Sequence, residues 1–534
     1  MATLLKFVKD SPMLAYVEKR RMQASNDVAL DVRKRLGQFL TPAPIAHFMA
    51  SLFTCRSKHL FLLDAGAGIG SLTAAFVDHV LALRQPPESV SVVMWEVDPE
   101  MLAHLSNVVR RCHDECHKIG IKFTAVIIPE DFTESGAKII LDRLLGKRTY
   151  AFNCAILNPP YRKIQTNSPE RMALRKVGLE TSNLYAGFVG LAIKLLNPGG
   201  QLVAITPRSF CNGPYFRPFR ELFLREMRFR LIHTFERRDR AFADDGVLQE
   251  NIVFHAVKNT RTEKRVTISY SHGAEDATLS SRMVHHDAVV SSSDPELIVH
   301  VPHSKHDEAA REKIDLERMT LVDLGINVST GRVVDFRARK FLRMQPGIDT
   351  APLIYPLHFE RGCVTWPRLS AKKPNAIEVN DNTRYMLVPK GYYVLVKRFT
   401  SKEERRRVVA VVLDPKRITA PEFAFENHIN FYHANGKGLP ELLAKGLAAY
   451  LNTTTVDRYF RQFSGHTQVN ASDLRKLTYP DRTALEGIGS QLGPAFLFQE
   501  GLDTLVDEEL AAWRNKQQSS QSKLKAASKR LSLF

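Results

Sequence analysis

Short apolar runs alternate with amphipathic stretches from about Leu60 to Val257. Continuous apolar runs predict buried strands, and apolar positions that repeat every three or four residues predict helices. The expected strands are Leu60–Asp64, Val90–Glu96, Lys122–Ile128, Phe152–Leu157, Gln201–Thr206, Leu231–Phe235 and Asn251–Val257, the last two forming a hairpin. The expected helices are Leu72–Leu83, Pro99–Lys118, Leu184–Leu196 and Phe216–Met227, the third stopped by Asn197-Pro198-Gly199-Gly200. This alternation predicts a doubly wound α/β unit with a seven-stranded sheet.

The alternation stops near Lys258–Lys264, which predicts a domain boundary there. We expect an α/β domain over residues 1–260, with a helical segment at its N-terminus, and a mixed α+β domain over residues 261–534. The second domain has strand patterns at Tyr392–Lys397 and Arg407–Leu413 and helix patterns at Pro440–Leu451 and Leu502–Lys516. It ends in a basic, low-complexity tail, Gln517–Lys529, which we expect to be mobile.

The composition indicates a large basic protein that can bury a sizeable core. The 534 residues carry a formal net charge of +18, which favours a polyanionic partner, nucleic acid above all. No apolar run approaches the roughly 20 residues of a membrane span, and the N-terminal residues do not resemble a signal peptide. The six cysteines are scattered, as expected for reduced thiols in the cytoplasm. Cys112-His113 and Cys116-His117 share one helix pattern without the remaining ligands at a zinc spacing, so we expect no metal site.

A glycine-rich segment follows the first predicted strand. Asp64-Ala65-Gly66-Ala67-Gly68-Ile69-Gly70 ends that strand and opens a helix, where the backbone can pass close to a ligand. Ser71 stands where a dinucleotide fingerprint has its third glycine, which argues against NAD. A plain tight turn is the alternative to a cofactor loop. We take Asp64, Ala65, Gly66 and Gly68 as cofactor-binding candidates.

Carboxylates follow the next two strands. Glu96 ends the second strand, where its carboxylate can accept both hydroxyls of a ribose. Asp131-Phe132 follows the third strand and offers an acceptor for an adenine amine and an aromatic face for its ring. Solvated strand-end carboxylates are the alternative for either residue alone. Three successive strand ends with such groups favour a cofactor site.

The sharpest motif is Asn158-Pro159-Pro160-Tyr161, directly after the fourth strand. The nitrogen of an aryl amine is a poor nucleophile until its hydrogens are held, and the Asn158 side-chain oxygen and the Pro159 carbonyl can each accept one of them. The prolines stiffen the loop, and Tyr161 can stack on the base. The amine can then attack a sulfonium methyl group directly, without a metal or a covalent intermediate. A Pro-Pro turn with an asparagine cap is the structural alternative.

The order of these motifs resembles that of the γ-class adenine-N6 DNA methyltransferases of type II restriction-modification systems, such as the TaqI and PstI modification methylases. Gly37-Gln38-Phe39-Leu40-Thr41-Pro42 is similar to the family's N-terminal cofactor motif, and a long C-terminal region matches its target-recognition domain. The resemblance implies a methyltransferase fold that binds S-adenosyl-L-methionine, with Phe39, Thr41, Pro42 and Asn158 among the cofactor contacts.

The resemblance also implies the reaction. A site-specific enzyme, acting as a monomer on double-stranded DNA in a prokaryotic cytoplasm, would methylate the N6 amine of a flipped-out adenine and protect the DNA from a cognate restriction endonuclease. Asn rather than Ser at position 158 favours adenine by family analogy. The family's aromatic residue on the other face of the base matches Phe242 best, with Phe235 and Phe210 as alternatives.

DNA contacts are expected in both domains. Arg162 and Lys163 open a long basic segment, Arg162–Ser182, that could close over the backbone. Two patches of the second domain, Ser329–Arg332 and Gly465–Asn470, resemble recognition loops. They contain residue types that read base edges, as do Arg337, Arg339 and Arg361. We take Arg332, Arg361, Gln468 and Asn470 as the candidates. Arg405–Arg407 is an exposed face or a phosphate contact.

Several functions stay open at this point. The same fold and loop could methylate cytosine N4, RNA or protein glutamine. A DNA-binding protein with a degenerate methyltransferase domain and a combined restriction-modification enzyme are further alternatives, although we find no nuclease-type carboxylate and lysine cluster.

Overall fold

The computed structural model describes residues 11–27, 39–54, 56–236, 250–259, 264–272, 280–291, 293–370, 372–465, 467–493 and 498–531. The chain forms two compact units. The first comprises Met1–His303 with Phe463–Gly465, and the second comprises Ser304–Gln462 with His466–Phe534. The division therefore comes later in the chain than the boundary expected near residue 260, because two further strands extend the first sheet.

The sheet of the first unit has nine strands among the described residues, in the order β3-β2-β1-β4-β5-β7-β6-β8-β9. The strands are β1 His59–Ala65, β2 Ser89–Trp95, β3 Lys122–Ile128, β4 Phe152–Leu157, β5 Leu196–Pro207, β6 Met227–Phe235, β7 Asn251–Lys258, β8 Arg265–Ser271 and β9 Ser280–His285. Strands β1 to β5 are parallel, and β7 is antiparallel to both β5 and β6. All seven predicted strands and the predicted hairpin are confirmed, and β8 and β9 add to them.

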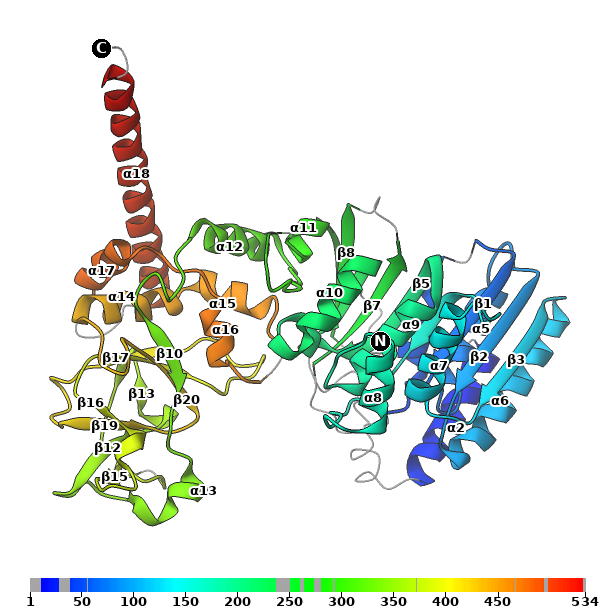
Figure 1. Cartoon of the computed structure of the whole chain (residues 1–534), viewed down its shortest axis with the longest axis horizontal. Helices are drawn as coiled ribbons and strands as arrows, with labels where there is room; N and C mark the ends of the chain where they lie inside the picture. The colour runs from blue at the N-terminus through cyan, green and yellow to red at the C-terminus, as the bar shows by residue number, and fades with distance from the viewer. Residues whose placement is uncertain are drawn as a thin grey trace. The chain divides into compact units, whose positions relative to one another are not determined.

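Helices cover both faces of this sheet (Figure 1). They are α2 Pro12–Asp27, α4 Ala43–Ser51, α5 Ser71–Leu81, α6 Pro99–Lys118, α7 Phe132–Leu144, α8 Pro169–Lys176, α9 Leu184–Leu195, α10 Arg217–Glu226, α11 His286–Val289, and the short 3₁₀ turns η1 Arg208–Cys211 and η2 Pro214–Phe216. One apolar core packs helices α7, α8, α9 and α10 against one face of the sheet, and a second packs α2, α4, α5 and α6 against the other face. The predicted doubly wound α/β architecture is confirmed.

One predicted stop signal has a second role. Helix α9 ends at Leu195, as Asn197-Pro198-Gly199-Gly200 requires, but these residues already belong to strand β5. Pro198 cannot continue the helix, and Gly199 adopts a positive φ of 78°, which reverses the chain without a separate loop.

The second unit combines two small sheets with helices. Its strands are β10 Asn327–Thr330, β11 Leu342–Arg343, β12 Thr350–Ile354, β13 Phe359–Glu360, β14 Cys363–Val364, β15 Ala376–Glu378, β16 Leu387–Pro389, β17 Tyr393–Lys397, β18 Ala410–Leu413, β19 Glu422–Phe425 and β20 Ile429–His433. One sheet has the order β10-β20-β17-β18-β14-β13, and the other has the order β11-β15-β12-β19-β16. The mixed α+β architecture expected here is confirmed.

The helices of the second unit are α12 Lys305–Leu316, α13 Asp335–Ala338, α14 Glu441–Leu451, α15 Thr454–Arg461, α16 Ala471–Arg475, α17 Arg482–Ser490 and α18 Gln499–Leu531, with 3₁₀ turns η4 Arg339–Phe341, η5 Pro356–His358 and η6 Arg384–Met386. The tail Gln517–Lys529, expected to be mobile, is helical and continues α18, the red helix of Figure 1. No helix in the described ranges combines the length and apolarity needed to cross a membrane.

Two glycines set the packing of α14 against α17. A Cβ atom at Gly446 would lie 1.8 Å from the Leu485 carbonyl oxygen, and one at Gly489 would lie 2.0 Å from the Leu442 carbonyl oxygen. The two helix backbones therefore touch, and any side chain at either position would force them apart.

We expect Gly446→Ala to lower the free energy of unfolding of the second unit by about 2 kcal/mol or more, since backbone cannot yield as a flexible side chain can. Thermal unfolding measures the effect. Gly493→Ala is the matched control, because a Cβ there meets nothing within 4 Å. Equal midpoints for the two variants would show that the helices can separate without cost.

Candidate active site

The glycine loop after β1 is tied to the end of β2. The amides of Gly66 and Ala67 both donate to the Trp95 carbonyl oxygen at 2.9 Å. Gly66 and Gly68 have φ angles of 73° and 55°, which strain any residue with a Cβ. A Cβ at Gly68 would also lie 2.9 Å from Leu40 Cδ2. The two glycines thus allow a tight loop that runs beside residue 40.

The Glu96 carboxylate holds this loop by a hydrogen bond from the Gly68 amide. Its Oε2 accepts the Gly68 amide at 2.7 Å, and its Oε1 accepts the amides of Val97 and Asp98 at 2.8 and 2.9 Å. The side chain is buried, and burial raises its pKa although the three backbone amides oppose the shift. A carboxylate has about four acceptor positions, so it retains capacity for a ligand hydroxyl.

Asn158 connects the Asn158–Tyr161 loop to the segment Phe39–Thr41. Its Nδ2 donates to the Phe39 carbonyl oxygen at 2.7 Å and to Thr41 Oγ1 at 2.9 Å. Its Oδ1 accepts from the Tyr161 hydroxyl at 3.0 Å, and the same hydroxyl lies 3.2 Å from the Ile205 carbonyl oxygen. Every polar atom of the Asn158 side chain is therefore engaged.

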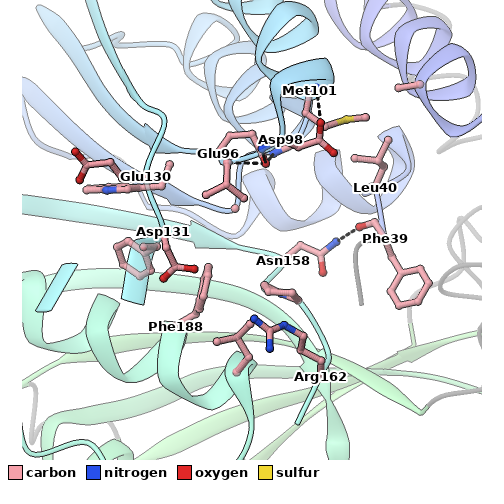
Figure 2. A pocket seen from close by; sticks show the side chains of 18 residues that line it. Phe39, Leu40, Glu96, Asp98, Met101, Glu130, Asp131, Asn158, Arg162 and Phe188 are labelled. Carbon is pink, nitrogen blue, oxygen red and sulfur yellow. Dashed lines mark hydrogen bonds between the residues drawn. The ribbon is translucent and has the colours of Figure 1, made fainter. Parts of the chain in front are cut away.

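These segments line one cavity at the carboxyl edge of the sheet, and Figure 2 shows their side chains converging on it from separate elements. The lining residues are Ala24, Phe39, Leu40, Gly66, Gly68, Trp95, Glu96, Val97, Asp98, Met101, Glu130, Asp131, Phe132, Asn158, Pro160, Arg162, Leu184 and Phe188. Four are carboxylates and one is a cation, in a chain whose net charge is +18. The cavity therefore favours a ligand that carries positive charge.

The lining contains most of the expected cofactor residues: Phe39, Gly66, Gly68, Glu96, Asp131, Phe132 and Asn158. Asp131 also caps α7, since it accepts the Thr133 amide at 2.7 Å. The Phe132 ring is only 2% exposed and packs against Trp95 and Phe188, with ring centroids 4.9 and 5.1 Å apart. These two ring contacts fix the position of Phe132 in the cavity wall.

Four expected cofactor residues are absent from the cavity lining: Thr41, Pro42, Asp64 and Ala65. Thr41 is 4% exposed and bonds Asn158, and Pro42 caps the start of α4. Asp64 is fully buried and accepts the Thr73 hydroxyl at 2.6 Å. These residues support the residues that form the cavity wall.

Among the expected catalytic residues, Asn158 and Pro160 line the cavity. Pro159 and Tyr161 flank Pro160 in the same loop, with the Tyr161 ring centroid 6.1 Å from that of Phe39. Phe242 lies outside the described residues. Its alternatives, Phe235 and Phe210, are both buried in the apolar cores.

Further lining residues were not singled out from the sequence. Trp95 and Asp98 flank Glu96, so their place in the chain could have suggested them. Asp98 also caps α6, accepting the Glu100 amide at 2.9 Å. Leu184 and Phe188, four residues apart on α9, have no local signal, because only the packing of α9 beside the loop brings them to the cavity.

The expected DNA contacts lie in different places. Arg162 lines the cavity and pairs with Glu170 at 2.6 Å, whereas Lys163 is exposed. In the second unit, exposed Arg332 follows β10 and donates to the Tyr385 carbonyl oxygen at 2.7 Å. Arg361 is in the β13–β14 turn, at the opposite end of that sheet.

The loop Thr467–Asn470 lies beside β17. Gln468 pairs with Phe399 in an isolated bridge, and its side-chain oxygen lies 3.5 Å from an Arg398 guanidinium nitrogen. Asn470 begins α16, where Asp473 Oδ2 accepts its amide at 3.1 Å. The Asn470 side chain is half-buried, and its Nδ2 donates to Asp473 Oδ2 at 3.3 Å. No group of three or more metal-ligating side chains is found among the described residues.

Comparison with known proteins places the chain in a family. Residues 115–242 match the family model described as Eco57I restriction-modification methylase. The chain is 43% identical over 494 residues to the Type II methyltransferase M.PstI of Providencia stuartii, which covers 92% of this chain and 96% of that relative. The chain belongs to the type II methyltransferase family. The methyltransferase is also 43% identical over 480 residues to M.BsuBI of Bacillus subtilis, covering 89% of this chain and 93% of that relative.

The family membership confirms the resemblance seen in the sequence and, with it, the methyltransferase fold. Among solved structures, the type IIG restriction endonuclease BpuSI aligns with 91% of this chain and 66% of its own, at 12% identity and a TM-score of 0.44.

Asp64 gives the methyltransferase a pH-dependent stability. Complete burial raises the pKa of its carboxyl from 3.8 to about 7, although the Thr73 hydroxyl bond opposes the shift. Between these two values the folded chain holds a proton that the unfolded chain has lost. The free energy of unfolding therefore falls as the pH rises through this window.

We expect the contribution of Asp64 to the free energy of unfolding to fall by about 3 kcal/mol between pH 5 and pH 8. Asp64→Asn should abolish this pH dependence because an amide does not titrate. Urea unfolding of both proteins at the two pH values measures the difference. Parallel pH profiles for wild type and variant would mean that Asp64 is ionised in the folded state across this range.

Proposed function

We propose that the chain transfers a methyl group from S-adenosyl-L-methionine to the N6 amine of an adenine flipped out of double-stranded DNA. The observation that carries the proposal is the position of Asn158 and Pro160 in the wall of the same acidic cavity as Gly66, Gly68 and Glu96. Family membership supports DNA as the substrate, and the formal net charge of +18 supports a polyanionic partner.

The residues that line the cavity suit S-adenosyl-L-methionine in charge, hydrogen bonding and apolar surface. Its sulfonium and ammonium groups match the carboxylates that line the wall, and Glu96 retains acceptor positions for ribose hydroxyls. The apolar side chains of Phe132, Phe188 and Met101 offer a surface for the adenine ring. When bound, the cofactor supplies an electrophilic methyl group.

Asn158 and Pro159 would prepare the target amine. The Asn158 oxygen accepts one bond from Tyr161, which leaves one lone pair for an amine hydrogen, and the Pro159 carbonyl would accept the other hydrogen. Holding both hydrogens turns the nitrogen lone pair toward the methyl group. Most of the rate enhancement then comes from orientation and electrostatic complementarity.

The target adenine would have to leave the duplex, at a cost of a few kcal/mol of lost stacking and pairing. Tyr161 offers an aromatic ring beside Asn158, and Phe242 is proposed for the other face of the base. Arg162, which lines the cavity, exposed Arg332 and half-buried Gln468 are proposed DNA contacts. Methylation would protect the recognition sequence from a cognate restriction endonuclease.

The first test is transfer of labelled methyl from S-adenosyl-L-methionine to mixed genomic duplex DNA, followed by nucleoside analysis. We expect N6-methyladenine, and Asn158→Ala should lower the rate by about a hundredfold or more because an acceptor for the amine is lost. N4-methylcytosine would overturn the choice of base but keep the mechanism. Label on RNA or protein alone would overturn DNA as the substrate.

The glycine loop gives a second prediction. Gly68→Ala should weaken S-adenosyl-L-methionine binding about tenfold or more, because the φ of 55° is unfavourable for a residue with a Cβ and the new Cβ would displace Leu40, which lines the cavity. Isothermal titration calorimetry measures the dissociation constant. Gly120→Ala is the matched control, since it carries a similar φ of 79° with no atom within 4 Å of the new Cβ. Equal loss of affinity in both variants would point to general strain rather than the cavity.

A further inference from the structure

The amide nitrogen of Asn158 is held by two acceptors from a segment more than a hundred residues away in the chain. One is the Phe39 carbonyl oxygen, at 2.7 Å, and the other is the Thr41 hydroxyl oxygen, at 2.9 Å. Figure 2 shows the first of these bonds at the cavity wall. Both hydrogens of the Asn158 amide nitrogen are thereby used.

This arrangement decides which end of the Asn158 amide faces the target. The two ends have almost the same shape, so packing alone cannot distinguish them. A backbone carbonyl only accepts hydrogen bonds, so the end beside Phe39 must be the nitrogen. The oxygen then lies on the other side, where the Tyr161 hydroxyl donates to it at 3.0 Å and one lone pair remains.

A reversed amide would defeat the reaction. It would offer N–H donors to the hydrogens of the target amine and would remove the acceptor that activates the amine. It would also bring its oxygen against the Phe39 carbonyl oxygen. Orientation of this amide is therefore a requirement for transfer, distinct from cofactor binding.

Residues 39 to 41 divide two tasks between them. Leu40 lines the cavity and lies against Gly68 of the glycine loop, whereas Thr41 is 4% exposed and is absent from the described cavity wall. The Thr41 side chain therefore acts on the catalytic loop and not on the cofactor space. Its hydroxyl is the one side-chain acceptor among the hydrogen bonds described for the Asn158 nitrogen.

We propose that Thr41 is a positioning residue for methyl transfer, whose hydroxyl works with the Phe39 carbonyl to keep the Asn158 oxygen turned toward the target amine. The inference rests on the proposed function and extends it from the residue that touches the amine to the one that orients it. Within the N-terminal motif, Leu40 would then contact the cofactor, and Thr41 would orient Asn158.

Thr41→Val tests the proposal, because valine keeps the shape of threonine and lacks the acceptor. We expect the single-turnover rate of label transfer to genomic duplex DNA to fall about tenfold, as for one lost hydrogen bond to a buried donor. The dissociation constants for S-adenosyl-L-methionine and for the DNA should stay within about twofold of wild type. Thr41→Ser retains the acceptor and should recover most of the rate.

Two further variants complete the test. Thr41→Ala removes the hydroxyl without placing a methyl group against the Asn158 nitrogen. Its transfer rate should also fall about tenfold, so it replaces Thr41→Val as the test if that variant does not fold. Thr124→Val, on the far edge strand β3, is the control for the substitution itself and should keep the wild-type rate. Thermal unfolding of each variant separates misfolding from a slower chemical step.

The outcomes separate this inference from the proposed function. A wild-type rate in Thr41→Val or Thr41→Ala, or a loss of cofactor affinity that accounts for the whole effect, would overturn the positioning role while leaving methylation intact. A slow Thr41→Ser would also overturn it, since the acceptor is present there. If the wild-type protein labels no DNA, the proposed function fails before Thr41 is in question.

Discussion

The parallel pairing of β1 with β2 and β4 is the constraint on which the site depends. Ala65 pairs with Trp95, and Asp64 pairs with Ile156. Because the carboxyl ends of parallel strands meet at one edge, this register brings the glycine loop, Glu96 and Asn158 together although they are widely separated in the chain. The cavity follows from strand pairing, and the helices on both faces hold that pairing in a dry core.

The charge distribution divides the protein into two environments. The chain as a whole is strongly basic, while the cavity wall carries four carboxylates and one arginine. The net positive charge favours a polyanionic partner, whereas the carboxylates of the wall favour a cationic small molecule. Several of these carboxylates also serve the fold: Asp98 and Asp131 cap helices, and Glu96 fastens the glycine loop. Binding chemistry and local stability thus use the same side chains.

The sequence was sufficient where the signal is local. Strand and helix patterns predicted the sheet, the glycines after β1 predicted the tight loop, and Asn-Pro-Pro-Tyr marked the loop that follows β4. It was insufficient where two distant segments meet. Leu184 and Phe188 reach the cavity through helix packing, whereas Asp64 and Thr41, both expected to contact the cofactor, are buried and are absent from the cavity wall. The continuation of the sheet into β8 and β9 was also missed, although Val266, Ile268 and Tyr270 alternate with polar residues in β8 as in a half-buried strand.

By itself, the sequence determined the order of the strands along the chain, the residues at their ends and the family to which the chain belongs, since each depends on side chains close together in the chain. Only the tertiary structure decided which of those residues face the cavity and which support it. The direction of the Asn158 amide is the clearest case. Its two ends differ only in which partners they meet, and those partners, Phe39 and Thr41, are adjacent to Asn158 only in the folded chain.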